Sequence, residues 1–294
     1  MTFAAAAALS VLVASRPLAA QRVPGRDLYQ FPLGALAEPA SLASSAGGGF
    51  WNPATLALPD SLRVLLSATA LNSPIEQAVS AQLGTVSYRF RRGLTAGLQL
   101  SQAAVGDLLR TDTDPQSIGG EIPYRSTIVS AVVAARRRGG SVGVALRSRS
   151  ASVDESNGRA TSLDVGGTIE RPFGLPVRAA ASTFLQSLDG KGDRVSVLGA
   201  AEALLPGRAD LRLGVAAQRD RGSGSETFLY GSGRAGILEL RGGFARQSGF
   251  GSSTTRLRLG LGLRYARYLV GVAREEGTAG LGSTYQFMLT TVFR

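Results

Sequence analysis

The chain has 294 residues, 38 of them glycine, while aromatic residues make up only 6%. A large soluble core built from bulky side chains is therefore not expected. The formal net charge is +11, and all basic residues except Lys191 are arginines spread along the chain. The chain contains 0 histidines and 0 cysteines, which excludes disulfides, ordinary zinc sites and triads with a histidine base. We expect no enzymatic activity, no cofactor and no metal site.

The first 20 residues are predicted to be a signal peptide. Residues 3–14 are almost entirely apolar and are followed by a Leu-Ala-Ala sequence that ends at Ala20. This run is too short to span a bilayer as a helix but has the length of the apolar part of an export signal. We therefore expect the mature protein to lie outside the cytoplasm.

Residues 21–60 show no sustained strand periodicity and contain five prolines. Their middle is glycine-rich and ends in the sequence Gly49-Phe50-Trp51-Asn52-Pro53. Asparagine is a good helix N-cap, and proline is favourable at the first helical position. The pattern predicts a short helix capped at Asn52, and Trp51, the chain's single tryptophan, is expected to pack beside the cap.

From residue 61 onward, apolar and polar residues alternate with the period of two that is typical of strands. In residues 255–265, for example, leucines and Tyr265 fall on one face, and arginines and glycines on the other. Fourteen strands are predicted, at residues 62–71, 80–91, 93–105, 126–136, 141–152, 160–171, 175–187, 193–204, 209–219, 225–234, 236–246, 253–264, 266–275 and 282–294. An even number suits a single-chain outer-membrane barrel.

The two strand faces favour a transmembrane barrel over a soluble sandwich. The apolar face consists of leucine, valine, alanine, threonine and tyrosine, which can face lipid but would leave voids between two stacked sheets. A secreted, soluble β-protein remains the alternative. Short and long links between the strands are predicted to alternate, so that residues 106–125 and 153–159 form loops on the outer side.

The polar face is predicted to enclose an interior that contains arginines. The candidate solute-binding residues are Arg178, Arg212, Arg241, Arg256 and Arg258, with Arg264 beside them. Enclosed guanidinium groups without partners would favour anionic solutes or the acidic head of an amphipathic one. The alternative is a network in which Asp164, Glu170, Glu202 and Glu239 pair with these arginines and brace the wall.

The motif at Gly49, Trp51, Asn52 and Pro53, between a signal peptide and a barrel of about fourteen strands, resembles the FadL superfamily of outer-membrane proteins. This resemblance implies that residues 21–60 fold back into the barrel of residues 61–294 as a plug, or hatch. It also implies either uptake of hydrophobic solutes or the role of the PorV/PorQ-like proteins of the type IX secretion system. The closing strand, with Phe293 near its end, resembles the C-terminal signature by which such barrels are recognised for insertion.

The sequence therefore predicts an antiparallel transmembrane β-barrel in the bacterial outer membrane, with lipid around it. The expected function is uptake of hydrophobic or amphipathic small solutes. The alternative is a non-transporting, PorV-like barrel that shuttles or anchors secreted proteins at its outer loops. Nucleic-acid binding is not expected, because the aromatic residues lie mostly on the face opposite the arginines.

Overall fold

The computed structural model describes residue 29 and residues 32–73, 79–90, 93–106, 108–111, 117–188, 195–205, 210–220, 224–249, 252–277 and 282–294. The predicted signal peptide, residues 1–20, and most of residues 21–31 lie outside the described residues. No helix in the described part of the chain is long and apolar enough to cross a membrane.

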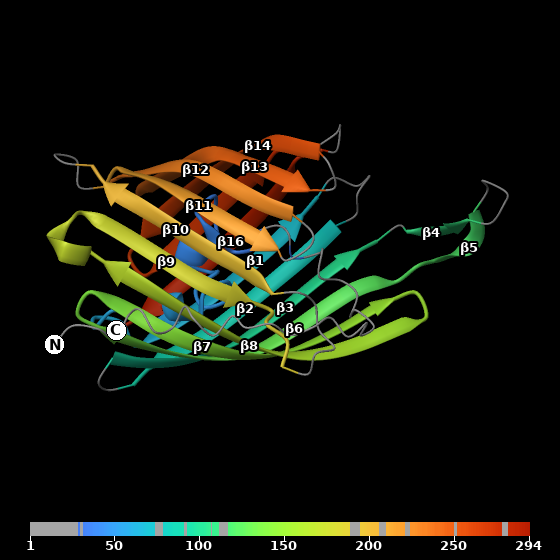
Figure 1. Cartoon of the computed structure of the whole chain (residues 1–294), viewed down its shortest axis with the longest axis horizontal. Helices are drawn as coiled ribbons and strands as arrows, with labels where there is room; N and C mark the ends of the chain where they lie inside the picture. Colours follow the sequence, from blue (N-terminus) through green and yellow to red (C-terminus); the bar gives the residue numbers. More distant parts are fainter. Residues whose placement is uncertain are drawn as a thin grey trace.

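The described residues form a closed antiparallel β-barrel (Figure 1). Its strands are β1 (Val64–Asn72), β2 (Val79–Arg89), β3 (Leu94–Val105), β6 (Tyr124–Arg137), β7 (Gly140–Val153), β8 (Ser156–Glu170), β9 (Val177–Phe184), β10 (Ser196–Leu204), β11 (Arg212–Asp220), β12 (Gly224–Ala235), β13 (Leu238–Gly249), β14 (Ser252–Tyr265), β15 (Tyr268–Glu275) and β16 (Thr284–Phe293). Neighbours in sequence pair with each other around the ring, and β1 closes it by pairing with β16 from Val64↔Phe293 to Asn72↔Tyr285. The predicted number and order of barrel strands are confirmed.

The barrel has two different ends. The loop end carries the connection between β3 and β6, within which β4 (Leu109–Thr111) and β5 (Ser117–Glu121) form a separate two-stranded sheet. The turn end carries the tight connections at residues 138–139, 236–237 and 266–267, and a short 3-10 helix, η6 (Pro172–Gly174). Strands β6, β7 and β8 extend beyond the rest of the wall toward the β4–β5 hairpin (Figure 1).

The structure differs from the predicted connections in three details. Residues 153–159 do not form a loop, because β7 and β8 continue to a tight turn at Asp154 and Glu155, with Asp154 at φ 52°. The polar residues after this turn lie on strand β8 beyond the apolar belt. The predicted loop at residues 106–125 contains β4 and β5 and the first residues of β6. The alternation of link lengths holds only in part, because the β13–β14 connection at the loop end is also short.

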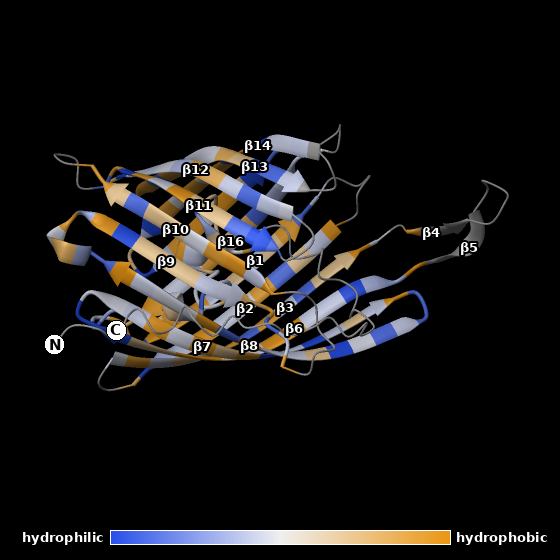
Figure 2. Cartoon of the chain, in the orientation of Figure 1, coloured by the Kyte–Doolittle hydropathy of each residue, from blue (hydrophilic) through white to orange (hydrophobic). Residues whose placement is uncertain are grey.

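The outward face of the barrel is apolar over the middle of the wall. On β3, the outward Leu98 is 60% exposed, whereas the inward Gln99 on the same strand is 2% exposed. Leu229 and Phe244 on neighbouring strands are each 60% exposed. Figure 2 shows this alternation as hydrophobic bands along the strands. Apolar residues that face outward around a closed barrel form the surface that a transmembrane barrel presents to lipid.

Residues 32–58 lie inside the barrel. They contain the 3-10 helices η3 (Ala40–Leu42) and η4 (Pro53–Leu56), and almost all of their side chains are buried. Inward-facing side chains from all round the wall hydrogen-bond to this segment: Gln99 of β3 donates to the carbonyl oxygen of Gly48, Ser182 of β9 donates to that of Trp51, and Gln286 of β16 accepts from the amide of Gly34.

Candidate functional site

The interior of the barrel is the candidate site, and Asn52 fixes residues 32–58 within it. The Asn52 side chain caps η4 by accepting a hydrogen bond from the Ala54 amide at 3.0 Å. Its Nδ2 group donates to the carbonyl oxygens of Ser41, at 2.8 Å, and of Gly167 on β8, at 3.3 Å. One buried side chain thus joins the helix cap, the 3-10 helix η3 and the barrel wall, and the predicted cap at Asn52 is present.

Two glycines on the barrel wall make room for the Asn52–Pro53 turn. Gly143 of β7 and Gly166 of β8 are directly opposite each other in the strand pairing. A Cβ atom on Gly166 would lie 2.0 Å from Oδ1 of Asn52, and one on Gly143 would lie 2.4 Å from the carbonyl carbon of Pro53. We call this pair the glycine notch. The segment approaches the wall at a distance that a side chain on either residue would prevent.

Gly49 and Trp51, in the first part of the Gly49–Pro53 motif, also make close contacts inside the barrel. Gly49 has a φ of +82°, in the left-handed region that favours glycine, and a Cβ there would lie 3.0 Å from Leu56. The Trp51 ring is 4.6 Å from Phe184 of β9 and 5.2 Å from Phe50, and its Nε1 donates to the Leu33 carbonyl at 2.8 Å. The expected packing of Trp51 beside the cap is present.

Arg147 of β7 is an interior residue that the sequence did not single out. Its side chain and that of Asp164 on β8 are both 0% exposed, with Nε 2.5 Å from the Asp164 carboxylate. The guanidinium also donates to the Phe50 carbonyl at 2.5 Å and lies 5.3 Å from the Phe50 ring and 5.1 Å from the Phe184 ring. A fully buried ion pair therefore attaches the wall to the backbone of the segment.

The predicted interior arginines all lie in ion pairs. Near the turn end, the Glu202 carboxylate is 2.9 Å from both Arg178 and Arg212. Arg241 bridges two carboxylates, Glu38 of the inner segment at 2.7 Å and Glu239 of β13 at 2.6 Å. This arrangement fits the bracing network that the sequence left open, and Arg241 joins the wall to the segment.

Arg256 and Arg258 form a second cluster nearer the loop end. Both contact Glu226 of β12 and Glu275 of β15, at distances of 2.6 to 3.0 Å. Each guanidinium shares the same two carboxylates, so the charges balance within the cluster. Arg264, which the sequence also placed inward, lies 3.8 Å from Glu239 and remains 49% exposed.

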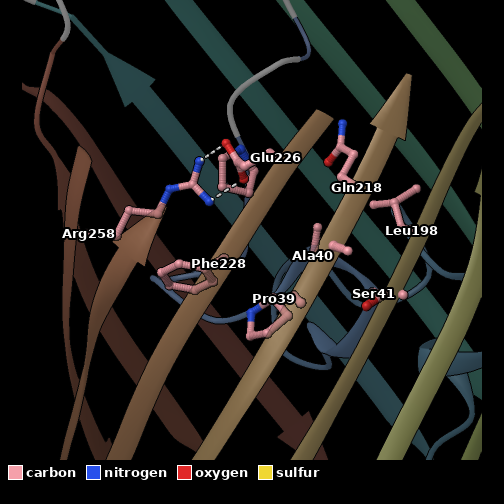
Figure 3. Close-up of a pocket in the computed structure, with 12 residues that line it drawn as sticks. Pro39, Ala40, Ser41, Leu198, Gln218, Glu226, Phe228 and Arg258 are labelled. Carbon is pink, nitrogen blue, oxygen red and sulfur yellow. Dashed lines mark hydrogen bonds and ion pairs between the residues drawn. The ribbon is translucent and has the colours of Figure 1, made fainter. Parts of the chain in front are cut away.

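Two cavities lie on opposite sides of residues 39–45. The larger, of about 360 Å³, is at the turn end and is bordered by Leu42, Ser44 and Ser45. The smaller, of about 20 Å³, is bordered by Pro39, Ala40 and Ser41 together with Leu198 of β10 and Ala216 and Gln218 of β11. Figure 3 shows the smaller cavity, with the ion pair of Arg258 and Glu226 and the Phe228 ring beside Pro39.

The wall of the larger cavity is amphipathic. Its apolar residues include Leu58, Leu62, Leu65, Leu269 and Val292. Its charged residues are Arg136, Glu170, Arg178, Arg241, Arg264 and Arg267. Among the described residues, no three carboxylate, histidine or cysteine side chains come together as a metal site.

Glu38 is the acidic group of the inner segment. Its carboxylate accepts a hydrogen bond from the Ser44 amide at 3.1 Å and pairs with Arg241. Burial raises the pKa of Glu38 above its ordinary value, and the nearby Arg241 opposes that rise. The side chain therefore joins the turn around η3 to the wall, and its burial in this contact couples its protonation to the docking of the turn.

No family model matches this chain, and no curated protein matches it. Among solved structures, it is similar to mutants of the Rhodopseudomonas blastica porin. For one of these the identity is 11% and the TM-score 0.44, and for a triple mutant they are 11% and 0.42; each match covers 79% of this chain and 100% of the porin. At such identities, and with TM-scores below 0.5, the similarity carries no information about what this barrel binds.

Proposed function

We propose that the protein is a bacterial outer-membrane β-barrel of the FadL superfamily that takes up small amphipathic or hydrophobic solutes. In this proposal residues 21–60 are its plug, and solutes pass between the plug and the wall formed by β10–β13. The observation that carries the proposal is the position of the two cavities on opposite sides of residues 39–45. The same residues would then form the constriction of the path.

Leu42 is the residue that we place at this constriction. Its side chain is 1% exposed and packs with Ala180, Phe228, Tyr230 and Ala245 of the wall, while Ala200 and Ala216 lie beside them. Because these residues on β10 and β11 are alanines, the wall presents little side-chain volume to Leu42. An apolar side chain against small wall residues can yield to a solute with little loss of hydrogen bonding, whereas the buried hydrogen bonds of Asn52 cannot.

The larger cavity supports the choice of an amphipathic solute. Leucines and Val292 line one part of it and guanidinium groups another, so that an apolar body and an acidic head could both be accommodated. Arg178 and Arg241 already pair closely with carboxylates. Arg264, with its longer 3.8 Å contact and 49% exposure, and Arg267, which contacts the Tyr268 ring, are the guanidinium groups left to meet the head.

Conductance and solute uptake test the proposed path. The protein is reconstituted in planar bilayers and in vesicles, and Leu42→Ala is compared with Leu56→Ala, which removes the same volume from the buried cluster of η4 with Val132 and Ala145. We expect Leu42→Ala to raise conductance and the uptake of an alkyl sulfonate severalfold, while Leu56→Ala leaves both near the wild-type level. Equal effects of the two variants would contradict a path at Leu42.

A second function is favoured by the extension of β6–β8 and the β4–β5 hairpin beyond the barrel (Figure 1). This extended part could anchor a secreted protein, as in the PorV-like alternative. Deletion of residues 108–121 would distinguish the two functions. Loss of a co-purified secreted protein with unchanged uptake would support anchoring, and the reverse result would support transport.

A further inference from the structure

Charge on the outer face of the barrel strands is of one sign. Every carboxylate of the described barrel strands lies at an inward position, namely Asp164, Glu170, Glu202, Asp220, Glu226, Glu239 and Glu275. The outward-facing charged residues of the same strands are all arginines: Arg125, Arg137, Arg159, Arg219, Arg246 and Arg274. All of these except Arg137 lie within a few residues of the loop end.

Four of these arginines occur in the same arrangement at two places on the wall. In the β12 patch, Arg219 is opposite Ser225, and Arg246 is opposite Thr227, so that two arginines flank two hydroxyl residues of the central strand. The Ser225 hydroxyl is also 2.9 Å from that of Ser248 on β13. Residues directly opposite each other on one face of a sheet are near neighbours, so the charged and hydroxyl groups converge.

The β7 patch repeats this arrangement on the extended part of the wall. Arg125 of β6 is opposite Ser152, and Arg159 of β8 is opposite Ser150. In each patch, two guanidinium groups and two hydroxyls face outward around one central strand. All of these groups donate hydrogen bonds, and arginine in particular matches the geometry of phosphate oxygens.

Nothing described in the structure neutralises these patches. No ion pair between described residues includes Arg125, Arg159, Arg219 or Arg246. In contrast, the arginines chosen as interior site residues all have carboxylate partners. The outward guanidinium groups are therefore available to an anion from outside the chain.

The position of the patches identifies the source of that anion. Toward the turn end, the outward neighbours of the β12 patch are Val215, Leu229 and Phe244, which are 44%, 60% and 60% exposed. Those of the β7 patch soon give way to Val129 and Leu146. The β12 patch thus borders the apolar belt at the level where lipid headgroups meet a transmembrane barrel. The β7 patch is separated from the belt by one outward layer of hydroxyl residues, which includes Thr127 and Ser148.

We propose that each patch binds the phosphate group of an anionic lipid in the leaflet at the loop end, with the lipid's acyl chains lying along the belt. This inference rests on the proposed membrane location. In the β12 patch, Arg219 and Arg246 pair with the phosphate oxygens, and the hydroxyls of Ser225 and Thr227 donate to the same group. The β7 patch binds a second lipid in the same way.

Lipid retention by the purified full-length protein tests this assignment. Native mass spectrometry in a neutral detergent counts the molecules of lipid A, a lipid with two phosphates, that remain bound, and phosphatidylcholine serves as the lipid without net charge. The variants are Arg219→Gln/Arg246→Gln and Arg125→Gln/Arg159→Gln. The matched control is Arg137→Gln/Arg138→Gln, which removes two exposed arginines from the turn end.

We expect wild-type protein to retain lipid A and each patch variant to lose affinity at one site, by about fivefold for each arginine removed. The control variant should match the wild type. Unchanged retention in both patch variants, or an equal loss in the control, would overturn the inference. Displacement of lipid A by millimolar inorganic phosphate would also overturn it, because the sites would then bind free anions.

Insertion of the wild-type protein into lipid vesicles is measured separately, by protection from protease. If insertion and uptake succeed but the patch variants retain lipid A normally, the lipid sites are wrong and the proposed function stands. If the wild type does not insert and remains monodisperse in plain buffer, the proposed function fails, and the lipid sites fail with it.

Discussion

The two sides of the barrel hold residues 32–58 by different means. On the Asn52 side, formed by β6–β9, the segment fits a notch of two glycines and is attached by buried hydrogen bonds and the Arg147–Asp164 pair. On the Leu42 side, formed by β10–β13, it meets the wall through an apolar side chain, and Arg241 reaches it through an ion pair with Glu38. The smaller cavity borders β10–β12 on the Leu42 side, whereas the larger one borders Leu42 and Arg241 and also Arg136, Ser141, Thr168 and Glu170 of β6–β8.

In the proposed path, this difference would fix the segment on one side and let it yield on the other. At the Asn52–Pro53 turn the backbone closely contacts the wall and both side-chain polar groups of Asn52 are hydrogen-bonded, so displacement of this turn would break buried hydrogen bonds. The Leu42 side chain packs on alanines and on the rings of Phe228 and Tyr230, and it can move without breaking a hydrogen bond of its own. The contrast predicts that substitutions on the Asn52 side change stability, while those on the Leu42 side change permeability.

The largest effect is expected from Arg147→Met. This substitution leaves the Asp164 carboxylate buried without its ion-pair partner, and we expect the free energy of unfolding to fall by about 3–5 kcal/mol. Urea unfolding in lipid vesicles measures the change, with the fluorescence of Trp51 as the probe. The double variant Arg147→Met/Asp164→Leu removes both charges and should recover most of the loss. A fall below about 1 kcal/mol for the single variant would show that the pair does not secure the Asn52 side.

A smaller effect is expected from Gly166→Ala, which places a methyl group where Oδ1 of Asn52 lies. Overpacking of this kind costs about 1–3 kcal/mol, and displacement of the Asn52 turn should shift Trp51 emission to longer wavelength. Gly199→Ala on β10 is the matched control, since its nearest neighbour, the Ala180 carbonyl oxygen, is 3.9 Å away. Equal emission spectra for the two variants would contradict the role of the glycine notch.

Much of the barrel could be predicted from the sequence because lipid imposes a period of two on every strand. The alternation assigned Arg178, Arg241 and Arg258 to the interior, and the structure places them there in ion pairs. It did not reveal their partners Glu38 and Glu275, because alternation gives the face of a residue but not its neighbours around the ring.

The Asn52 side was predicted less completely, and the cause is one misplaced turn. A loop at residues 153–159 gave no register for the β7–β8 hairpin. With the turn at Asp154 and Glu155, register alone sets Gly143 opposite Gly166 and makes Arg147, which is opposite Ser162, a diagonal neighbour of Asp164. The polar residues after the turn resembled a loop because this hairpin extends beyond the apolar belt, where nothing requires an apolar face.

The smallest effect is expected from the ionisation of Glu38, which tests the Leu42 side alone. Burial raises the pKa of Glu38, so the protonated form stabilises the docked segment at low pH, and this contribution is lost as the pH rises through the raised pKa. The charged groups around it are Arg241 and Arg178, which favour the carboxylate, and Glu239 and Glu202, which oppose it. Because Arg241 is only 2.7 Å away, much of the burial effect is offset and the change should be modest.

Single-channel conductance between about pH 4 and pH 8 measures this contribution, because looser docking of η3 should widen the proposed path at Leu42. We expect wild-type conductance to rise with pH, while Glu38→Gln, which cannot ionise, shows no such rise. Trp51 emission should stay constant over the same range in both proteins, since the Asn52 side does not depend on Glu38. A conductance rise that persists in Glu38→Gln would assign the pH dependence to another group. A parallel shift in Trp51 emission would show that the Asn52 side and the Leu42 side move together, which would contradict a segment that is fixed on one side only.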